Sequence, residues 1–400
     1  MRKTHPRVMA YLGFLLTIPL GEVSVAPGFA WLTVTKVSFL LLLGVLAYSW
    51  IRGWRPVMPT RSVLVSMGLL VFGVCLSALC CGERGASLSY AIRIVALCML
   101  CLATVSLSKE PGFLVKALGA LAIAAFLCAL LGIYQTSTGE TLASLGQYGY
   151  FGRMIELCQA VEPGGVSVVR ASAAFDHPNV LGTFLIGILP AALFFMLHRG
   201  SHQSRILSGG AAIAIIIALV YTFSRSAWLG GLVGVSLVVL PLRWSWSRIA
   251  GVVVGGLVLA VILLPPEAKQ VLLNRTGTAQ PYDSGRLYSW HTAGSMIAAH
   301  PLLGVGPGMF HHRYAAYADK SEVYKQNPLH HMDAHNTFLD LAAEGGLPVC
   351  LAFVALMVAA LIHLVGAADL WQARGPTISL GIPLLAGCVA ILSQSLLQSL

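Results

Sequence analysis

Eleven apolar runs, each roughly twenty residues long, limit what this chain can fold into, because a helix of that length crosses a bilayer. A membrane-spanning barrel would need alternating segments of about ten residues, which the sequence lacks. The chain is therefore expected to be all-α, a polytopic transmembrane helical bundle of eleven or more spans. The runs cover residues 8–24, 29–51, 62–80, 88–107, 113–134, 177–197, 206–223, 227–242, 249–264, 347–367 and 378–398.

Composition supports a membrane protein. Only 10% of the residues are charged and 57% are hydrophobic, whereas soluble domains carry about 25% charged residues. The net charge of +10 could suggest nucleic acid as a partner. In a membrane protein, anchoring charges near anionic headgroups explain such an excess. We therefore expect membrane lipids, and not nucleic acid, around this chain.

Positively charged residues gather in alternate loops. They precede the first span and follow the second, fourth, sixth, eighth and tenth. The positive-inside rule then places the N-terminus in the cytoplasm and both long loops, 135–176 and 265–346, on the opposite side. The basic start is interpreted as a start-transfer helix without a cleavage site. These charges are Arg2, Lys3, Arg7, Arg52, Arg55, Arg61, Lys109, Lys116, Arg199, Arg205, Arg243, Arg248 and Arg374.

The loop 265–346 is expected to be partly helical and to hold the functional site. A helix is predicted over 284–299, and a second short helix is predicted around His335, with Asp333 as its N-cap. The glycines of 304–308 lack the flanking strand and helix of a dinucleotide site, so they predict a turn. We divide the rest of the chain into N-terminal spans (1–134), a first outer loop with the central spans (135–264), and C-terminal spans (347–400).

Three arginines at the outer ends of spans and in the outer loops are candidates for binding an anion: Arg170, Arg225 and Arg286. Guanidinium gives bidentate hydrogen bonds to phosphate oxygens and stays charged at any relevant pH. Converging on one outer face, the three would suit the diphosphate of a lipid-linked substrate. Each also has a structural interpretation: a loop charge for Arg170, an interfacial anchor for Arg225 and an ion pair within its helix for Arg286. Arg93 is a fourth candidate.

The histidines of the large loop allow two interpretations. His330 and His331, with His335 and Asp333, could bind a metal, but the spacing fits no HExxH or EF-hand pattern. Alternatively, His335 is a general base. Just inside a helix N-terminus, its protonated form would be disfavoured by the helix dipole, which leaves a neutral imidazole that can accept a proton. We favour the base and expect no metal and no cofactor, while an ordinary loop histidine remains open.

Four segments in order resemble the O-antigen ligase and polymerase-like membrane proteins. They are RASAAFDHPNVLG (170–182), TFSRSAWLG (222–230), SGRLYSWHTAGSMIAAHPLLGVGPGMF (284–310) and HNTFLDLAAEGGLPV (335–349). The resemblance covers about residues 165–350, and the N-terminal spans share only general character with it.

The resemblance implies a multi-span glycosyltransferase of the C type (GT-C). Such an enzyme takes glycan from an undecaprenyl-diphosphate carrier at the periplasmic face of the bacterial inner membrane. In the ligases the acceptor is a sugar hydroxyl of lipid A-core, the anomeric centre is inverted, and no metal is needed. By motif position, His335 would be the base and Arg286 would bind the diphosphate. Arg225 and Arg170 would support the donor, and His177 and Asn336 would have binding or packing roles.

Two alternatives stay open. The motifs of polymerases, which extend a carrier-linked acceptor, overlap with those of ligases. The single large loop with its late HNTFL motif and the chain length favour a ligase. A transporter or lipid-linked glycan flippase belongs to a different class, and it would usually show charges at the membrane midplane and an internal repeat. Most charges here lie at span ends, and we see no repeat.

Overall fold

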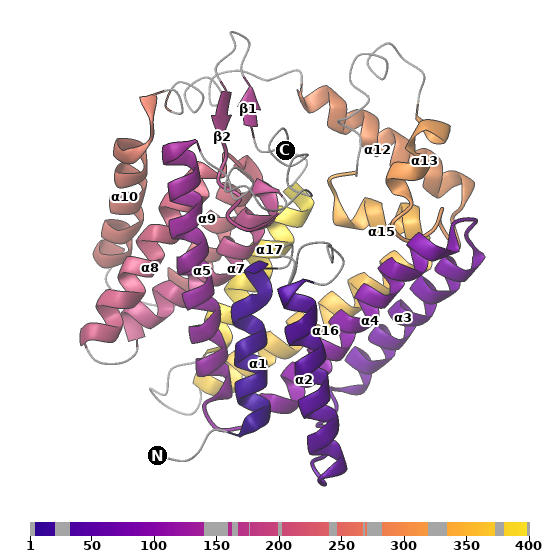
Figure 1. Ribbon diagram of the computed structural model, residues 1–400, viewed down its shortest axis with the longest axis horizontal. Helices are drawn as coiled ribbons and strands as arrows, with labels where there is room; N and C mark the ends of the chain where they lie inside the picture. The colour runs from indigo at the N-terminus through magenta and orange to yellow at the C-terminus, as the bar shows by residue number, and fades with distance from the viewer. Residues whose placement is uncertain are drawn as a thin grey trace. The chain divides into compact units, whose positions relative to one another are not determined.

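The computed structural model describes residues 5–20, 33–139, 159–161, 167–175, 177–198, 202–239, 246–266, 269, 282–318, 334–372 and 380–397. Helices dominate these residues, which confirms the all-α expectation (Figure 1). The elements are α1 (Pro6–Thr17), the 3-10 helix η1 (Ile18–Leu20), α2 (Val34–Ile51), α3 (Arg61–Cys80), α4 (Arg84–Leu107), α5 (Phe113–Thr138), β1 (Gln159–Val161), β2 (Ser167–Val169), α7 (Pro178–His198), α8 (His202–Tyr221), α9 (Arg225–Val239), α10 (Trp246–Leu263), α12 (Tyr282–Ala299), α13 (Phe310–Tyr317), α15 (Thr337–Gly345), α16 (Leu347–Gln372) and α17 (Gly381–Leu397). The two strands pair antiparallel, with Ala160 opposite Val168.

Every apolar run of the sequence overlaps one of these helices. Among the described residues, seven helices are long and apolar enough to cross a membrane, namely α2, α3, α4, α5, α7, α8 and α16. The other four runs contain the shorter apolar helices α1, α9, α10 and α17. Large apolar side chains on the long helices face outward, for example Phe72 at 66% and Ile92 at 61% exposure. Lipid would cover such surfaces, and the chain is a multi-pass membrane protein.

The chain forms two compact units, each assembled from separate stretches of sequence. Unit 1 comprises residues 1–55, 110–278 and 370–394, and unit 2 comprises residues 56–109, 279–369 and 395–400. The boundaries of these stretches differ from those of the four-part division made from the sequence. That division therefore stays a prediction.

Small residues let the helices of unit 1 approach closely. A Cβ on Gly387 of α17 would lie 2.5 Å from the carbonyl oxygen of Gly187 on α7. A Cβ on Gly230 of α9 would lie 2.8 Å from the carbonyl oxygen of Ala390. Helices in lipid gain little from hydrophobic association, so such backbone contacts stabilise their packing. These contacts pack α17 against α7 and α9, whose N-terminal ends carry the first two motifs.

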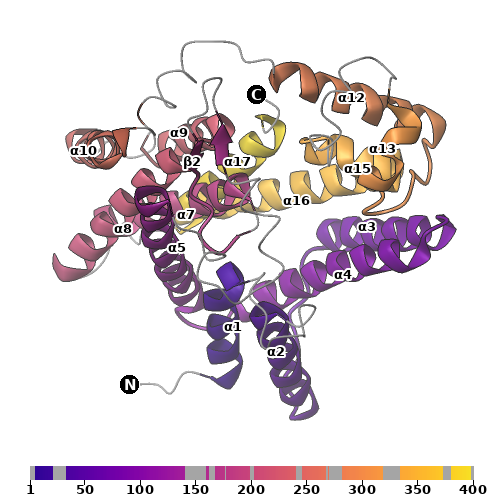
Figure 2. The same ribbon diagram turned by 45° about the horizontal axis from the view of Figure 1, so that its top comes forward.

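In unit 2, helices α12, α13 and α15 pack on one another beyond the ends of α3 and α4. Their shared core contains Ala293, Met296, Phe310, Tyr314 and Ala343. Two views show α15 between α12 and α3 (Figures 1 and 2). The helix predicted over 284–299 is present as α12, and it ends before His300 and Pro301 as expected.

The glycines of residues 304–308 form a turn, as predicted, and we call this segment the glycine turn. Gly304, Gly306 and Gly308 all have positive φ, and a Cβ on Gly304 would collide with the backbone of Glu344. Glu344 holds the turn from α15, because its buried carboxylate accepts hydrogen bonds from the N–H groups of Gly308 (2.8 Å) and Phe310 (3.0 Å). Sequence analysis did not single out Glu344.

We expect Glu344→Gln to lower the free energy of unfolding by about 2 kcal/mol, because a charged acceptor of two buried N–H groups becomes neutral and one partner is lost. Thermal unfolding in detergent measures the change. Glu83→Gln makes the same substitution at an exposed position and should leave stability unchanged. Equal melting temperatures for both variants would show that the carboxylate does not stabilise the turn.

Candidate functional site

His335 occupies a strained backbone position whose two neighbours are held in place. Its φ is +51°, a left-handed conformation that few non-glycine residues adopt. The Ala334 carbonyl accepts a hydrogen bond from Trp290 Nε1 at 3.0 Å. The Ala334 N–H donates to Asp340 Oδ1 at 2.8 Å. Ala334, the residue directly before His335, is therefore held by α12 at its carbonyl and by α15 at its N–H.

Asn336 fixes the other side of His335. Its side-chain oxygen accepts hydrogen bonds from the N–H groups of Phe338 (3.0 Å) and Leu339 (3.3 Å), so Asn336 is the N-cap of α15. The predicted cap was wrong in position, and Asp333 lies outside the described residues. Because Asn336 is the cap, His335 precedes α15 instead of lying just inside it, as the sequence had predicted. Asparagine is among the best N-cap residues, and it occupies the position directly before the helix.

Arg286 lies on α12, one helical turn before Trp290. Residues four apart share a helix face, so position 286 is on the face of α12 that reaches the Ala334 carbonyl. The two backbone positions are separated by about 6 Å along the helix axis. Helix α12 thus places position 286 on the side of the helix that meets the segment carrying His335.

Arg170 joins the first two motifs within unit 1. Its Nε donates to the Thr222 carbonyl at 2.8 Å, and an Nη donates to Asn179 Oδ1 at 3.2 Å. The Ala171 N–H donates to the Tyr221 carbonyl at 2.9 Å. The guanidinium therefore braces the end of α8 against the start of α7, which favours a structural part in its role.

His177 also makes a structural contact. Its Nδ1 accepts a hydrogen bond from the Asn179 N–H at 3.0 Å, and its carbonyl accepts from Val180 at 3.0 Å. The side chain thus accepts a hydrogen bond from one of the N–H groups that have no intrahelical partner in the first turn of a helix. Of the roles open to His177, hydrogen bonding at the start of α7 is the one that the geometry supports.

Arg225 is the first residue of α9 and its side chain is exposed. The neighbouring Ser224 and Ser226 are buried, and Phe223 has a φ of +50°. The Nε1 of Trp228 donates to the Leu219 carbonyl at 2.7 Å, which ties the first turn of α9 to the last turn of α8. A rigid, tight connection therefore presents Arg225 at a helix N-terminus.

Gln135 is a residue of unit 1 that sequence reasoning missed. It is 1% exposed on α5, directly after the apolar run 113–134. Its Oε1 accepts from the N–H groups of Ser172 (3.2 Å) and Ala173 (2.7 Å), and its Nε2 donates to the Ala173 carbonyl at 2.8 Å. One side chain therefore satisfies the buried backbone that directly follows Arg170. In the sequence, Gln135 is one of several polar residues that follow the run, and nothing distinguishes it from them.

We expect Gln135→Leu to lower the free energy of unfolding by about 3 kcal/mol, because buried N–H and C=O groups each cost about 1–3 kcal/mol when they lose their partner. Thermal unfolding in detergent measures the loss. Gln203→Leu repeats the substitution at an exposed position of α8 and serves as the control. Unchanged unfolding of Gln135→Leu would mean that the segment is held by other contacts.

Metal ligation receives no support from the described ranges, where no three His, Cys, Asp or Glu side chains could jointly hold an ion. His330 and His331, which entered that interpretation, lie outside those ranges. The described His311 and His312 stack edge to face, with ring centroids 5.7 Å apart.

Residues 210–354 match a family model described as O-antigen ligase. Over this segment the chain is similar to an O-antigen ligase domain. The domain contains the last three motifs, with Arg225, Arg286, His335 and Asn336, whereas Arg170 and His177 precede it. Among curated proteins, none matches the chain. The family comprises glycosyltransferase-like enzymes of the O-antigen ligase and polymerase type, so the domain supports that general activity.

Proposed function

We propose that the chain is an inverting, metal-independent glycosyltransferase that moves glycan from an undecaprenyl-diphosphate carrier to a sugar hydroxyl. The proposed acceptor is lipid A-core, which makes the protein an O-antigen ligase. The match of residues 210–354 to the O-antigen ligase family carries this proposal. The fixed backbone around His335 supports a defined position for one catalytic side chain.

In the proposed reaction, an imidazole nitrogen of His335 takes the proton of the acceptor hydroxyl. The hydroxyl oxygen forms a bond to the anomeric carbon on the face opposite the carrier. The bond from that carbon to the phosphate oxygen breaks, and the lipid diphosphate leaves with the electron pair. Configuration inverts in this single displacement. Holding both substrates in line lowers the barrier further, because bound reactants need no further ordering.

The leaving diphosphate needs positive charge. We assign this role to Arg286 on α12, because guanidinium can pair with two phosphate oxygens at once. Arg225 is assigned a supporting role in unit 1, since it is exposed at the N-terminus of α9, where helix N–H groups also favour anions. Arg170 supports the donor less directly, through the brace to Thr222 and Asn179.

We also propose that the site lies on the periplasmic face of the inner membrane. Positive charges in alternate loops place the N-terminus in the cytoplasm. The end of α3 and the start of α16, which hydrogen-bond the carbonyls of Leu303 and Pro301, then face the periplasm, together with α12 and α15. A site on that face of the inner membrane meets a lipid carrier at headgroup level.

Surface glycan from a host that lacks the gene tests the proposal, with the wild-type gene returned as a control. A ligase predicts long glycan that stays on the carrier in the deletion strain and moves to lipid A-core after complementation. Single repeat units on lipid A-core would identify a polymerase. Carrier-linked glycan that accumulates on the cytoplasmic side would identify a flippase. Transfer by purified protein should persist in chelator, and loss that a divalent ion restores would contradict metal independence.

A further inference from the structure

The turn between α12 and the glycine turn exposes two adjacent leucines. Residues 301–303 form this leucine turn, in which Leu302 is 71% and Leu303 is 36% exposed. Leucine side chains are usually buried in proteins. A cluster of exposed apolar side chains therefore indicates a surface that binds another molecule or a membrane. The position of the turn relative to the spans of unit 2 indicates what it contacts.

Two hydrogen bonds fix the depth of the leucine turn. The Leu303 carbonyl accepts from Ser77 Oγ on α3 at 2.5 Å. The Pro301 carbonyl accepts from the N–H of Leu347, the first residue of α16, at 2.8 Å. Helix α3 has 20 residues and is therefore about 30 Å long, which equals the thickness of the hydrocarbon core. Ser77 lies about 4.5 Å inside its end, so the leucine turn lies at the edge of the hydrocarbon.

The helix ends beside the leucine turn also present leucine outward. On α3, Leu79 is 59% exposed, and on α16, Leu347 and Leu351 are 44% and 66% exposed. These side chains belong to spans whose outward faces contact lipid in a membrane. The exposed leucines of the turn extend that lipid-facing surface from the spans to the loop.

We propose that the leucine turn inserts among the lipid acyl chains of the leaflet at this end of α3. The occupant of the surface is bilayer lipid. The turn joins the C-terminal end of α12 to the glycine turn that Glu344 holds, so its insertion anchors α12, α13 and α15 at headgroup level. Insertion follows from the exposure of Leu302 and Leu303 and from the depth of the turn, and it does not depend on the proposed glycosyl transfer.

Fluorescence quenching by brominated lipid tests the proposal. Leu302→Trp is reconstituted into phosphatidylcholine vesicles whose acyl chains carry bromine either near the carboxyl end or near the methyl end. His291→Trp is the control, because His291 is exposed on α12, nine residues before His300 and beyond α15 from α3. The emission of the unsubstituted protein, which has eight tryptophans, is subtracted from both variants.

We expect shallow bromine to quench the added emission of Leu302→Trp roughly twofold more than that of His291→Trp, as for a side chain in the membrane interface. Deep bromine should quench it less than shallow bromine. Equal quenching of the two variants would overturn the proposal. Emission that lipid bromine leaves unchanged but that shifts with protein concentration would also overturn it, by showing that a second copy covers the turn. Leu303→Trp gives the same reading if Leu302→Trp fails to elute as a single species.

Discussion

His335→Asn is expected to lower the rate of glycan transfer by about 10²- to 10⁴-fold, the usual contribution of a general base. Asparagine tolerates the positive φ found at this position better than most residues, so the backbone between Ala334 and Asn336 should persist. The imidazole is then the only group removed. Transfer from purified carrier-linked glycan to acceptor measures the rate, and thermal unfolding confirms that the variant is folded.

Two further variants separate chemistry from strain at position 335. His335→Ala should lose as much activity and should also unfold more easily, because alanine adopts left-handed backbone less readily than histidine or asparagine. His291→Asn on α12 should retain activity, since that side chain is exposed and has no assigned role. Near-normal transfer by His335→Asn would exclude this residue as the base, whatever the stability of the alanine variant.

Arg286→Lys is expected to lower transfer by about 10²- to 10³-fold, a loss typical of removing one charge-stabilising donor from a reaction site. Lysine keeps the charge but offers a single point in place of the planar fork that pairs with two phosphate oxygens. Steady-state kinetics with varied donor and fixed acceptor measures the change. The effect should appear with the carrier-linked donor and leave acceptor binding unchanged.

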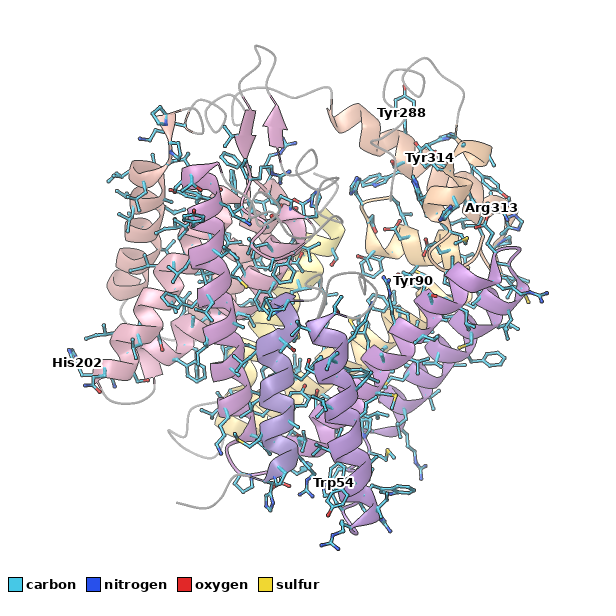
Figure 3. All side chains as sticks on the ribbon, in the orientation of Figure 1. Trp54, Tyr90, His202, Tyr288, Arg313 and Tyr314 are labelled. Carbon is cyan, nitrogen blue, oxygen red and sulfur yellow. The ribbon has the colours of Figure 1, made fainter. Side chains whose placement is uncertain are left out.

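The control for Arg286→Lys is Arg313→Lys on α13. Arg313 lies at the margin of unit 2, beside Gly82 at the end of α3 (Figure 3). That variant should transfer glycan normally. Full activity of Arg286→Lys would argue against diphosphate binding at this position, and equal losses in both variants would indicate a general effect of removing guanidinium from this unit.

The helices of this protein could be predicted from sequence because apolar length is a local property. Each predicted run overlaps a helix, and the helix of residues 284–299 ends where His300 and Pro301 indicated. The cap of α15 could not be predicted, since Asp333 and Asn336 are both good N-cap residues and only the backbone path selects one. The positive φ of His335 follows from the same backbone path and could not be predicted from the sequence either.

The supporting side chains of the site depend on contacts between distant positions. Gln135 meets Ala173 across 38 residues, and Glu344 meets Gly308 across 36. The identity of a polar residue does not reveal which distant backbone groups it will satisfy. Motif order indicated His335 and the arginines, whereas the residues that hold Arg170 and the glycine turn became evident only from their hydrogen bonds.

Unit 2 joins segments that are far apart in the sequence and are therefore synthesised at different times. Ser77 and Ser87 donate hydrogen bonds to the carbonyls of Leu303 and Pro307, which follow them by 226 and 220 residues. Translation at about 5–20 residues per second separates these partners by roughly 10 to 45 seconds. Helices α3 and α4 therefore enter the membrane long before their partners emerge from the ribosome. During biogenesis, the two serine hydroxyls therefore need other partners, such as a carbonyl of their own helix or interfacial water, until the large loop is synthesised.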